Sequence, residues 1–417
     1  MTENQLIDSD RLVGLRRRTS LVLLSGVSVG TTAFIILMTV TALVAERISG
    51  SATWSGVPIA ALVLGTAAGT SLLSMAMTRW GRRSGLILFY SIGASGALLA
   101  CSATLLASLP LLIVSLFVAG IGNSASALTR YVAADLQESD RRATMVGWIV
   151  WAGTVGAVAG PNLLAPADRL GSSMALPPLA GAYLVSLLLF FAAAVLYGLL
   201  LRPDPSLLSQ PSETDPRDDT VATVGVGGLY RTSQVQVSVV ALVFGHAVMV
   251  LVMTMTPLHL KAAGHSLEVI GAVASGHIIG MFLFAPVVGL LVDRLGEMPM
   301  IFTGQGILLL AALGGMVVPG SSPWLVSAVL FLLGLGWSFG YVAGSANLTR
   351  GIAAADRTLL QGRTDSMVWV SAAGASLLSS LLFSKIGFAG LCAVGAAALA
   401  ISATTIAVHQ VRRRAVT

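Results

Sequence analysis

The chain has 417 residues, of which 55% are hydrophobic and only 10% are charged, and its formal net charge is +6. A soluble globular domain carries about 25% charged residues, so most of the surface of this protein must face lipid. The basic residues stand singly between long apolar runs and build no element that reads a nucleic-acid groove, which sets nucleic acid aside as a partner.

Twelve apolar runs follow one another along the chain. Each has the roughly 20 residues that a helix needs to cross a hydrocarbon layer about 30 Å thick. Helices are expected because lipid cannot satisfy the open backbone groups of other structures. The first run follows a polar, basic N-terminus and is too long for a signal-peptide core, so we expect it to be retained. The predicted spans are 20–45, 53–77, 85–107, 110–129, 143–164, 178–201, 235–260, 267–292, 299–318, 322–349, 364–384 and 387–409.

The placement of basic residues predicts the orientation. Of the 24 Lys and Arg residues, 20 lie in the two termini or in the loops that the twelve spans place on the same side as the termini. By the positive-inside rule this side is cytoplasmic. The scarcity of lysine, together with heavy use of Ala and Gly, is typical of GC-rich bacterial genomes. We therefore expect a multi-pass protein of a bacterial cytoplasmic membrane with both termini inside.

The composition changes between spans six and seven. Residues 202–234 contain four prolines and five acidic residues, too little apolar surface for an ordered fold. We predict an N-terminal six-helix half (1–201), a flexible cytoplasmic linker (202–234) and a C-terminal six-helix half (235–417). The fold class expected is therefore an all-α membrane protein with twelve transmembrane helices in two pseudo-symmetric halves.

The two halves repeat a short phrase. LTRYVAAD at 128–135 follows the fourth span of the first half, and LTRGIAAAD at 348–356 follows the fourth span of the second. After the phrase, identical residues of the two halves recur at a constant separation of 221 residues. Parallel duplication about an axis along the membrane normal is an arrangement found in transporters. The residues matched at this offset are Arg142, Trp148 and Gly153 with Arg363, Trp369 and Gly374.

With twelve spans, a central linker and two signature loops, the chain resembles the major facilitator superfamily over its full length. The loop after the second span of each half in that family reads roughly G-x-x-x-D-R-x-G-R. GLLVDRLGE at 289–297 follows it at Gly289, Asp293, Arg294 and Gly296. SMAMTRWGRR at 74–83 keeps Arg79, Gly81, Arg82 and Arg83 but has Ser74 and Thr78 in place of the Gly and Asp.

The fifth span carries GAVAGP at 156–161, which resembles the signature of the drug/proton antiporter branch through Gly156, Gly160 and Pro161. The Gly-Gly that usually follows is replaced from Asn162 onward. Leu116 stands where an arginine of that branch is expected. These departures weaken the resemblance to the branch but not to the superfamily.

The resemblance implies a cytoplasmic gate built from the repeated loops. It pairs Arg82 with Asp135 and places Asp293 at the start of a helix of the opposite half, where the helix dipole favours an anion. Glu297 replaces the arginine that would meet Asp356. Alternatively, these residues only cap helices and fix the topology, since an exposed ion pair contributes about 0–1 kcal/mol. The candidate gate residues are Arg79, Arg82, Arg130, Asp135, Asp293, Arg294, Arg350 and Asp356.

Ionisable groups within the membrane are functional candidates because burying a charge there costs about 2.5 kcal/mol or more. All 18 acidic residues fall outside the middle of any predicted span; Glu46 comes nearest and could pair with Arg47. His246 and His277 lie at mid-depth, on spans that line the cavity in the resembled family. Histidine titrates near pH 6.5 and could carry protons. The alternative is a neutral imidazole bonded across two packed helices.

Other polar and aromatic residues at mid-depth suit an amphipathic organic solute. These are Asn123, Trp151, Trp337 and Tyr341, the last two being four residues apart on one helical face. Ordinary packing between helices is the alternative for all four. We include them, with the two histidines and Glu46, in a candidate pathway for substrate and protons.

The resemblance implies a secondary active transporter that works by alternating access. We expect proton-coupled efflux of small amphipathic organic molecules, with uptake by symport or uniport as the alternative, and a monomer. A membrane enzyme or a receptor is a third possibility, but GASG at 93–96, which matches the nucleophile box of intramembrane serine proteases, arises readily by chance. The two cysteines, Cys101 and Cys392, have no metal-ligand spacing and no P-loop occurs, so we expect no metal, no cofactor and no enzymatic activity.

Overall fold

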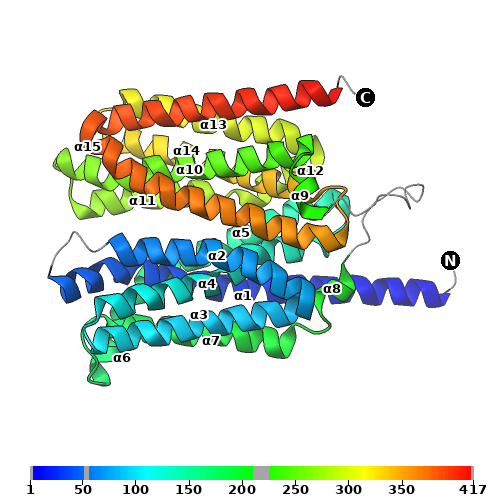
Figure 1. Ribbon diagram of the computed structural model, residues 1–417, viewed down its shortest axis with the longest axis horizontal. Helices are drawn as coiled ribbons and strands as arrows, with labels where there is room; N and C mark the ends of the chain where they lie inside the picture. Colours follow the sequence, from blue (N-terminus) through cyan, green and yellow to red (C-terminus); the bar gives the residue numbers. More distant parts are fainter. Residues whose placement is uncertain (1–2, 51–55, 210–224, 415–417) are drawn as a thin grey trace. The chain divides into compact units, whose positions relative to one another are not determined.

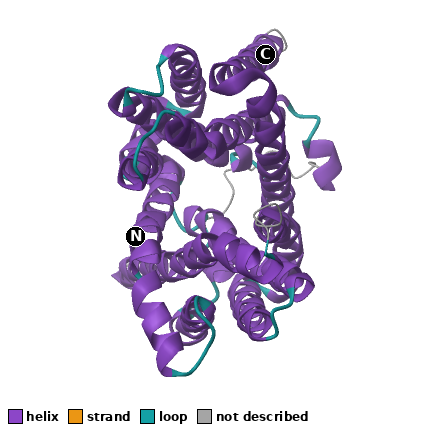
Figure 2. Ribbon diagram, turned by 90° about the vertical axis from the view of Figure 1, so that its left-hand side faces the viewer, coloured by secondary structure: helices purple, strands orange, loops and turns teal. Residues whose placement is uncertain are grey.

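The computed structural model describes residues 3–50, 56–209 and 225–414 of the chain. These ranges fold into helices and connecting loops, and no strand occurs within them (Figure 2). The α-helices are α1 (Glu3–Ser49), α2 (Gly56–Trp80), α3 (Arg82–Leu105), α4 (Leu109–Ala134), α5 (Arg142–Asn162), α6 (Leu164–Ser173), α7 (Ala180–Leu200), α8 (Pro205–Leu208), α9 (Gly225–Leu229), α10 (Ser233–Ala262), α11 (Leu267–Phe282), α12 (Ala285–Leu295), α13 (Glu297–Val317), α14 (Pro323–Thr349) and α15 (Ala354–Arg414).

Eleven helical stretches in the described ranges are long and apolar enough to cross a membrane. The last of them, Asp356–Gln410, has 55 residues, which would extend for about 80 Å as one straight helix. It does not stay straight, because Gly387 interrupts α15 with φ 68° and ψ −173°, a left-handed conformation that favours glycine. Figure 1 shows α15 doubling back on itself in its orange and red segments. The stretch therefore crosses twice, and the predicted all-α architecture with twelve spans is confirmed.

The predicted eighth span, 267–292, is divided into two helices. α11 ends at Phe282 and α12 begins at Ala285, with Pro286 in the first turn of α12. Proline lacks the N–H that would continue the ladder, and its ring clashes with the preceding turn, so a break at this point follows from the sequence. A short additional helix, α6, lies between spans five and six, in a stretch that we predicted to be a loop beyond residue 164.

Both ends of the predicted linker are ordered. Asp204 begins α8 by accepting a hydrogen bond from Ser206 N, and it also accepts one from Arg83 N at 3.0 Å. Arg16 Nε donates to Leu208 O at 3.0 Å, which holds α8 against α1. Residues 210–224 of the linker lie outside the described residues. The division of the chain at this linker stays a prediction.

The chain folds into two compact units. Unit 1 consists of Met1–Glu138, Ala152–Pro211 and Gln361–Trp369, and unit 2 of Ser139–Trp151, Ser212–Leu360 and Val370–Thr417. Each unit thus takes most of one predicted half and one short segment of the other. At the offset of 221, residues 361–369 correspond to 140–148, so the exchanged segments occupy equivalent places in the repeat.

Within each unit, small residues allow helix backbones to approach closely. In unit 1 a Cβ on Gly69 of α2 would lie 2.6 Å from Ile121 O of α4. In unit 2 a Cβ on Gly304 of α13 would lie 2.7 Å from Gly340 N of α14. Such contacts are typical of helix packing in membranes, where dispersion forces and short interhelical distances replace the hydrophobic effect.

Candidate functional site

The first predicted gate contact joins the start of α3 to the end of α4. Arg82, at the start of α3, donates from Nη2 to Asp135 Oδ2 at 2.5 Å, and both side chains are buried. Asp135 follows the last residue of α4, in the repeated phrase. Arg83 reinforces this corner by donating to Gly198 O of α7 at 2.6 Å. The structure therefore contains the Arg–Asp pair that the first signature loop predicted, and its role as a gate stays a prediction.

The second signature loop makes the other predicted contact. Asp293, near the end of α12, accepts hydrogen bonds from Ala143 N at 3.0 Å and from Thr144 N at 2.7 Å. These amides belong to the first turn of α5 and have no partner within their own helix. A carboxylate is favourable there because the helix dipole places positive potential at the N-terminus. Gly289 allows the approach, since a Cβ on it would lie 2.6 Å from Thr144 Cα.

The first half lacks an aspartate at the position equivalent to Asp293, and a buried ion pair lies near the equivalent contact instead. Arg130 of α4 donates from Nη2 to Asp365 Oδ1 of α15 at 2.6 Å, and each side chain is only 2% exposed. Tyr131 OH donates to the same oxygen at 3.2 Å, and the Arg130 guanidinium lies 4.2 Å from the Tyr131 ring centroid. Arg130 also donates to Ala127 O at 2.5 Å.

Arg130 was predicted from the sequence as a gate residue, but Asp365 was not. Asp365 is the second residue of the predicted span 364–384. An acidic residue at the end of a span is expected at the membrane–water interface, so it was not singled out. The repeat offset contained the missing signal, because Asp365 corresponds to Thr144, one of the two residues whose amides Asp293 binds. The corresponding segments of α5 and α15 thus both take part in an ionic contact, with the carboxylate on the partner helix in the first case and on α15 itself in the second.

Small and polar residues beside Asp365 in the sequence bring α15 into contact with α2. Ser366 Oγ donates to Ala67 O and lies 2.8 Å from Ser71 Oγ. Gly362 packs directly against Ser74, and a Cβ on Gly362 would lie 2.6 Å from Thr70 O. Ser74 occupies the place of the glycine in the signature loop, and Gly362 provides the space that its side chain requires.

The remaining gate candidates are not part of these buried contacts. Arg350 donates to Glu297 Oε2 at 2.7 Å, but 69% of its side chain is exposed, and both residues belong to the second half. Arg79 is exposed, with its guanidinium 6.0 Å from the Trp80 ring. Arg294 is exposed, and Asp356 lies in the first turn of α15.

His246 belongs to an aromatic cluster in unit 2. Trp337 Nε1 donates to His246 Nδ1 at 2.9 Å, and because an indole N–H can only donate, Nδ1 must be the unprotonated nitrogen of a neutral ring. Trp337 stacks on Tyr341 with a centroid distance of 4.5 Å and meets Phe282 edge-on at 6.0 Å. The structure therefore brings together three of the predicted pathway residues, His246, Trp337 and Tyr341, and adds Phe282.

His277 forms its hydrogen bond with the backbone rather than with a member of that cluster. It is 1% exposed, and its Nδ1 lies 2.8 Å from Leu330 O of α14. A carbonyl only accepts, so Nδ1 carries the hydrogen and Nε2 is the basic nitrogen. Nε2 is buried and has no hydrogen-bond partner in the described part of the chain. The hydrogen bond joins two packed helices, as expected if His277 has a structural role rather than a role in proton transport.

The other predicted pathway residues are dispersed. Asn123 Nδ2 donates to Thr66 Oγ1 at 3.4 Å, a bond between α4 and α2. Trp151 meets Trp148 edge-on at a centroid distance of 5.8 Å. Glu46 is exposed, and the neighbouring Arg47 donates to Pro178 O at 3.0 Å.

The glycines of the span-five motif pack α5 against α1. A Cβ on Gly156 would lie 2.7 Å from Thr32 N, and one on Gly160 would lie 2.6 Å from Ile35 Cγ2. Pro161 is the penultimate residue of α5, and its side chain is outside the described residues. The motif therefore has a packing role in unit 1. Among the described residues no group of three or more His, Cys, Asp or Glu side chains could hold a metal ion.

Sequence comparison shows relatives over most of the chain. A family model described as the Major Facilitator Superfamily matches residues 22–268. The uncharacterized MFS-type transporter YdeG of Bacillus subtilis is 34% identical over 367 residues, covering 86% of this chain and 84% of YdeG. The riboflavin transporter RfnT of Brucella anthropi is 28% identical over 379 residues, covering 89% of this chain and 90% of RfnT.

Solved structures share the fold. The human organic anion transporter MFSD10 superimposes with a TM-score of 0.72 at 15% identity, covering 94% of this chain and 99% of MFSD10. A bacterial homologue of the iron transporter ferroportin gives a TM-score of 0.70 at 16% identity, with the same coverage of both chains. At these identities the likeness shows the fold alone.

Proposed function

This chain belongs to the major facilitator superfamily, and we propose that it exports small amphipathic organic molecules in exchange for protons by alternating access. It is a membrane transporter rather than an enzyme. We further propose that it acts as a monomer in a bacterial cytoplasmic membrane, with both termini on the cytoplasmic side. The Arg-rich side of the chain supports this orientation through the positive-inside rule.

The single observation that best supports alternating access is the exchange of equivalent segments between the two units. Residues 139–151 of the first half pack with unit 2, where Asp293 caps α5, and residues 361–369 of the second half pack with unit 1, where Asp365 meets Arg130. Asp293 contacts the start of α5, and Asp365 lies at the start of the predicted eleventh span, both on the proposed cytoplasmic side. We propose that they close this side and that they break when the transporter opens inward.

The proposed substrate class rests on the aromatic cluster of unit 2. Trp337, Tyr341 and Phe282 provide ring surfaces, and His246 adds a polar edge, a combination that suits a flat organic molecule with polar substituents. The relative RfnT is named a riboflavin transporter, and riboflavin is such a molecule. We propose planar amphipathic compounds of this kind as the first substrates to test.

The bond between Trp337 and His246 suggests how a proton acts on this site. A proton bound at His246 Nδ1 would set one N–H group against another, so the hydrogen bond from Trp337 must break. Protonation of His246 would then move the Trp337 ring and its stack on Tyr341. We propose this as the step that links proton binding to substrate release.

Transport into proteoliposomes tests the proposal. Radiolabelled riboflavin and ethidium are offered separately to vesicles with an acidic lumen, with an acidic exterior, or with no pH gradient. Proton antiport predicts accumulation only with the acidic lumen, whereas the alternative, uptake by symport, predicts accumulation only with the acidic exterior. Flux that ignores the gradient would indicate a uniporter. If none of the conditions gives flux of either compound, the proposed substrate class is wrong.

The histidine step has its own readout in the same vesicles. His246→Ala should abolish the accumulation that the pH gradient drives while leaving exchange of labelled for unlabelled solute within about twofold, because exchange needs no net proton movement. His409→Ala, near the end of α15, is the matched control and should retain both activities. Unchanged gradient-driven accumulation in His246→Ala would eliminate this histidine as the coupling group.

A further inference from the structure

α1 and α7 form a seam that ends at the proposed cytoplasmic surface. Ser186 Oγ donates to Ala33 O at 3.2 Å, and Tyr197 OH donates to Leu23 O at 3.0 Å. As the residue numbers rise along α7 they fall along α1, so the helices are antiparallel. The C-terminal end of α7 therefore lies beside the part of α1 where the first apolar run begins.

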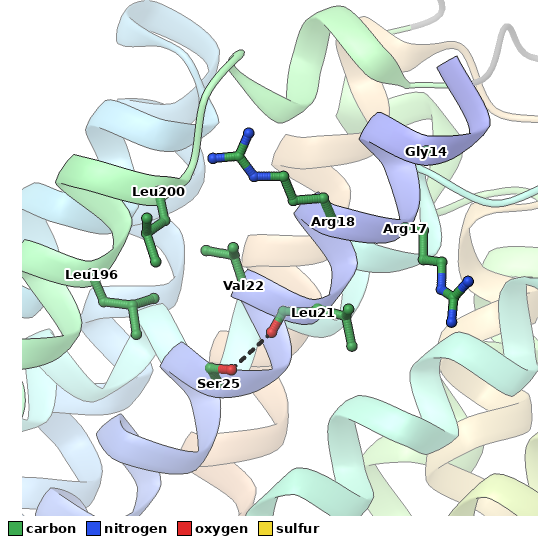
Figure 3. Close-up of a pocket in the computed structure, with 8 residues that line it drawn as sticks. All are labelled: Gly14, Arg17, Arg18, Leu21, Val22, Ser25, Leu196 and Leu200. Carbon is green, nitrogen blue, oxygen red and sulfur yellow. Dashed lines mark hydrogen bonds between the residues drawn. The ribbon is translucent and has the colours of Figure 1, made fainter. Parts of the chain in front are cut away.

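A groove of about 330 Å³ opens at this end of the seam. Its walls include the aliphatic side chains of Leu21, Val22, Leu196 and Leu200, and two arginines, Arg17 and Arg18, border it (Figure 3). Leu21 is 56% exposed and Leu200 is 46% exposed. Large apolar side chains exposed on a membrane-spanning helix face lipid chains rather than water, so the groove is open to the bilayer.

The three consecutive arginines of α1, Arg16, Arg17 and Arg18, differ in their contacts. Arg16 donates to Leu208 O and so contributes to holding α8. Arg17 and Arg18 are exposed, and neither forms an ion pair with any described residue. In Figure 3 Arg18 extends from α1 toward Leu200 of α7, over the groove, and Arg17 lies on the other flank of α1. Positive charge without an acidic partner among the described residues thus lies at the polar end of an apolar groove.

The wall below the arginines offers no polar group to a ligand. Ser25 Oγ donates to Leu21 O at 3.0 Å within α1, as the dashed line in Figure 3 shows, so the hydroxyl is already bonded to its own helix. A ligand that fits must therefore be negatively charged at one end and a hydrocarbon along the rest. A soluble anion such as inorganic phosphate would use only the arginines and leave the aliphatic walls unoccupied.

We propose that this groove is a binding site for one anionic phospholipid. The phosphodiester contacts Arg18, Arg17 adds to the local positive potential, and one acyl chain lies along the four aliphatic residues. Basic residues at the inner membrane surface attract anionic headgroups, with about 1 kcal/mol for each Lys or Arg near the surface. A zwitterionic headgroup carries a compensating positive charge and is attracted less. Nothing in this proposal depends on the transported solute.

Native mass spectrometry of the detergent-purified full chain tests the site. The protein is mixed with phosphatidylglycerol or with phosphatidylcholine of the same acyl chains, and the retained lipids are counted. The wild-type chain should retain one phosphatidylglycerol in preference to phosphatidylcholine. Arg18→Gln should lower that retention about fivefold, the equivalent of the contribution of one basic residue, whereas Arg18→Lys should keep most of it.

Two further variants make the result decisive. Arg231→Gln removes an exposed arginine at the opposite end of the linker and should leave phosphatidylglycerol retention unchanged. Leu196→Trp fills the groove without altering charge and should lower retention, and each variant is compared at equal monodispersity and thermal stability. Equal retention of the two lipids by the wild-type chain, or retention in Arg18→Gln equal to that in Arg231→Gln, would overturn the proposal.

Discussion

At the scale of single residues, Arg130 and Asp365 form an ion pair whose side chains are each only 2% exposed. Both charges are removed from solvent, and the guanidinium is further satisfied by Ala127 O and the Tyr131 ring. Removing one partner of such a pair leaves an uncompensated buried charge, which costs about 3–5 kcal/mol. Arg350 and Glu297 form the contrasting case, because their pair is largely exposed and is worth about 0–1 kcal/mol.

Asp365→Asn should therefore destabilise the closed arrangement of unit 1. The amide keeps the shape of the side chain but cannot neutralise Arg130, so we expect a loss of roughly 3 kcal/mol or more of folding free energy. Thermal unfolding of the purified protein in detergent measures it as a lower Tm. Glu297→Gln serves as the control and should leave the Tm nearly unchanged. Equal Tm values for the two variants would show that the buried pair contributes no more than the exposed one.

The residue scale is also where the sequence was least informative. Composition and periodicity place apolar residues well, but they do not show which polar residues meet across the two halves. The resemblance to known signature loops did supply the Arg82–Asp135 and Asp293 contacts. It could not supply Asp365, because the signature-loop pattern does not extend to this residue and its partner, Arg130, lies 235 residues away.

At the scale of elements, α2 and α12 make equivalent close contacts with different side chains. Gly289 of α12 lies against the start of α5, and Ser74 of α2 lies against Gly362 of α15. Position 74 has a serine where the signature loop has a glycine, and the glycine at position 362 leaves room for the serine side chain. Each contact therefore retains one glycine, on opposite sides of the interface in the two repeats.

Gly362→Ala should hinder the approach of α15 to α2. The new methyl group would lie 2.6 Å from Thr70 O, a backbone atom that cannot rotate away, and overpacking of this kind costs about 1–3 kcal/mol. We expect disulfide formation between Ser71→Cys and Ser366→Cys, introduced after Cys101 and Cys392 are replaced by Ala, to slow at least about fivefold. Gel mobility after timed oxidation measures the rate.

Gly374→Ala is the matched control on the same helix, since a Cβ on Gly374 would have no neighbour within 4 Å. It should leave the cross-linking rate as it was. An unchanged rate in Gly362→Ala as well would mean that the two helices do not need the glycine for their contact.

Elements were more predictable than residues because their signals are local. The length and apolarity of each run predicted the spans, and Pro286 and Gly387 show why one predicted span is divided and why one long helix covers two. The order at the N-terminal end of the linker was not predicted. It depends on Asp204 and Leu208 meeting Arg83 and Arg16, which are more than 100 residues away in the sequence.

At the scale of the whole molecule, the repeat explains why the chain uses the LTR…AAD phrase twice. Equivalent segments, 139–151 and 361–369, leave the half to which they belong in sequence and pack with the other unit. A duplicated chain can place a reversible contact at the same depth in both halves. Alternating access requires these contacts to break and re-form as the transporter changes between its two faces.

Distances between spin labels at Thr78 of α2 and Arg363 of α15, both exposed, test this requirement most directly. The labels are attached to Thr78→Cys and Arg363→Cys in a chain lacking Cys101 and Cys392, and double electron–electron resonance is recorded in lipid nanodiscs. We predict a short and a long distance in equilibrium, with the long one gaining population in Asp365→Asn but not in Glu297→Gln. A single short distance that is the same in all three proteins would contradict the proposed alternation.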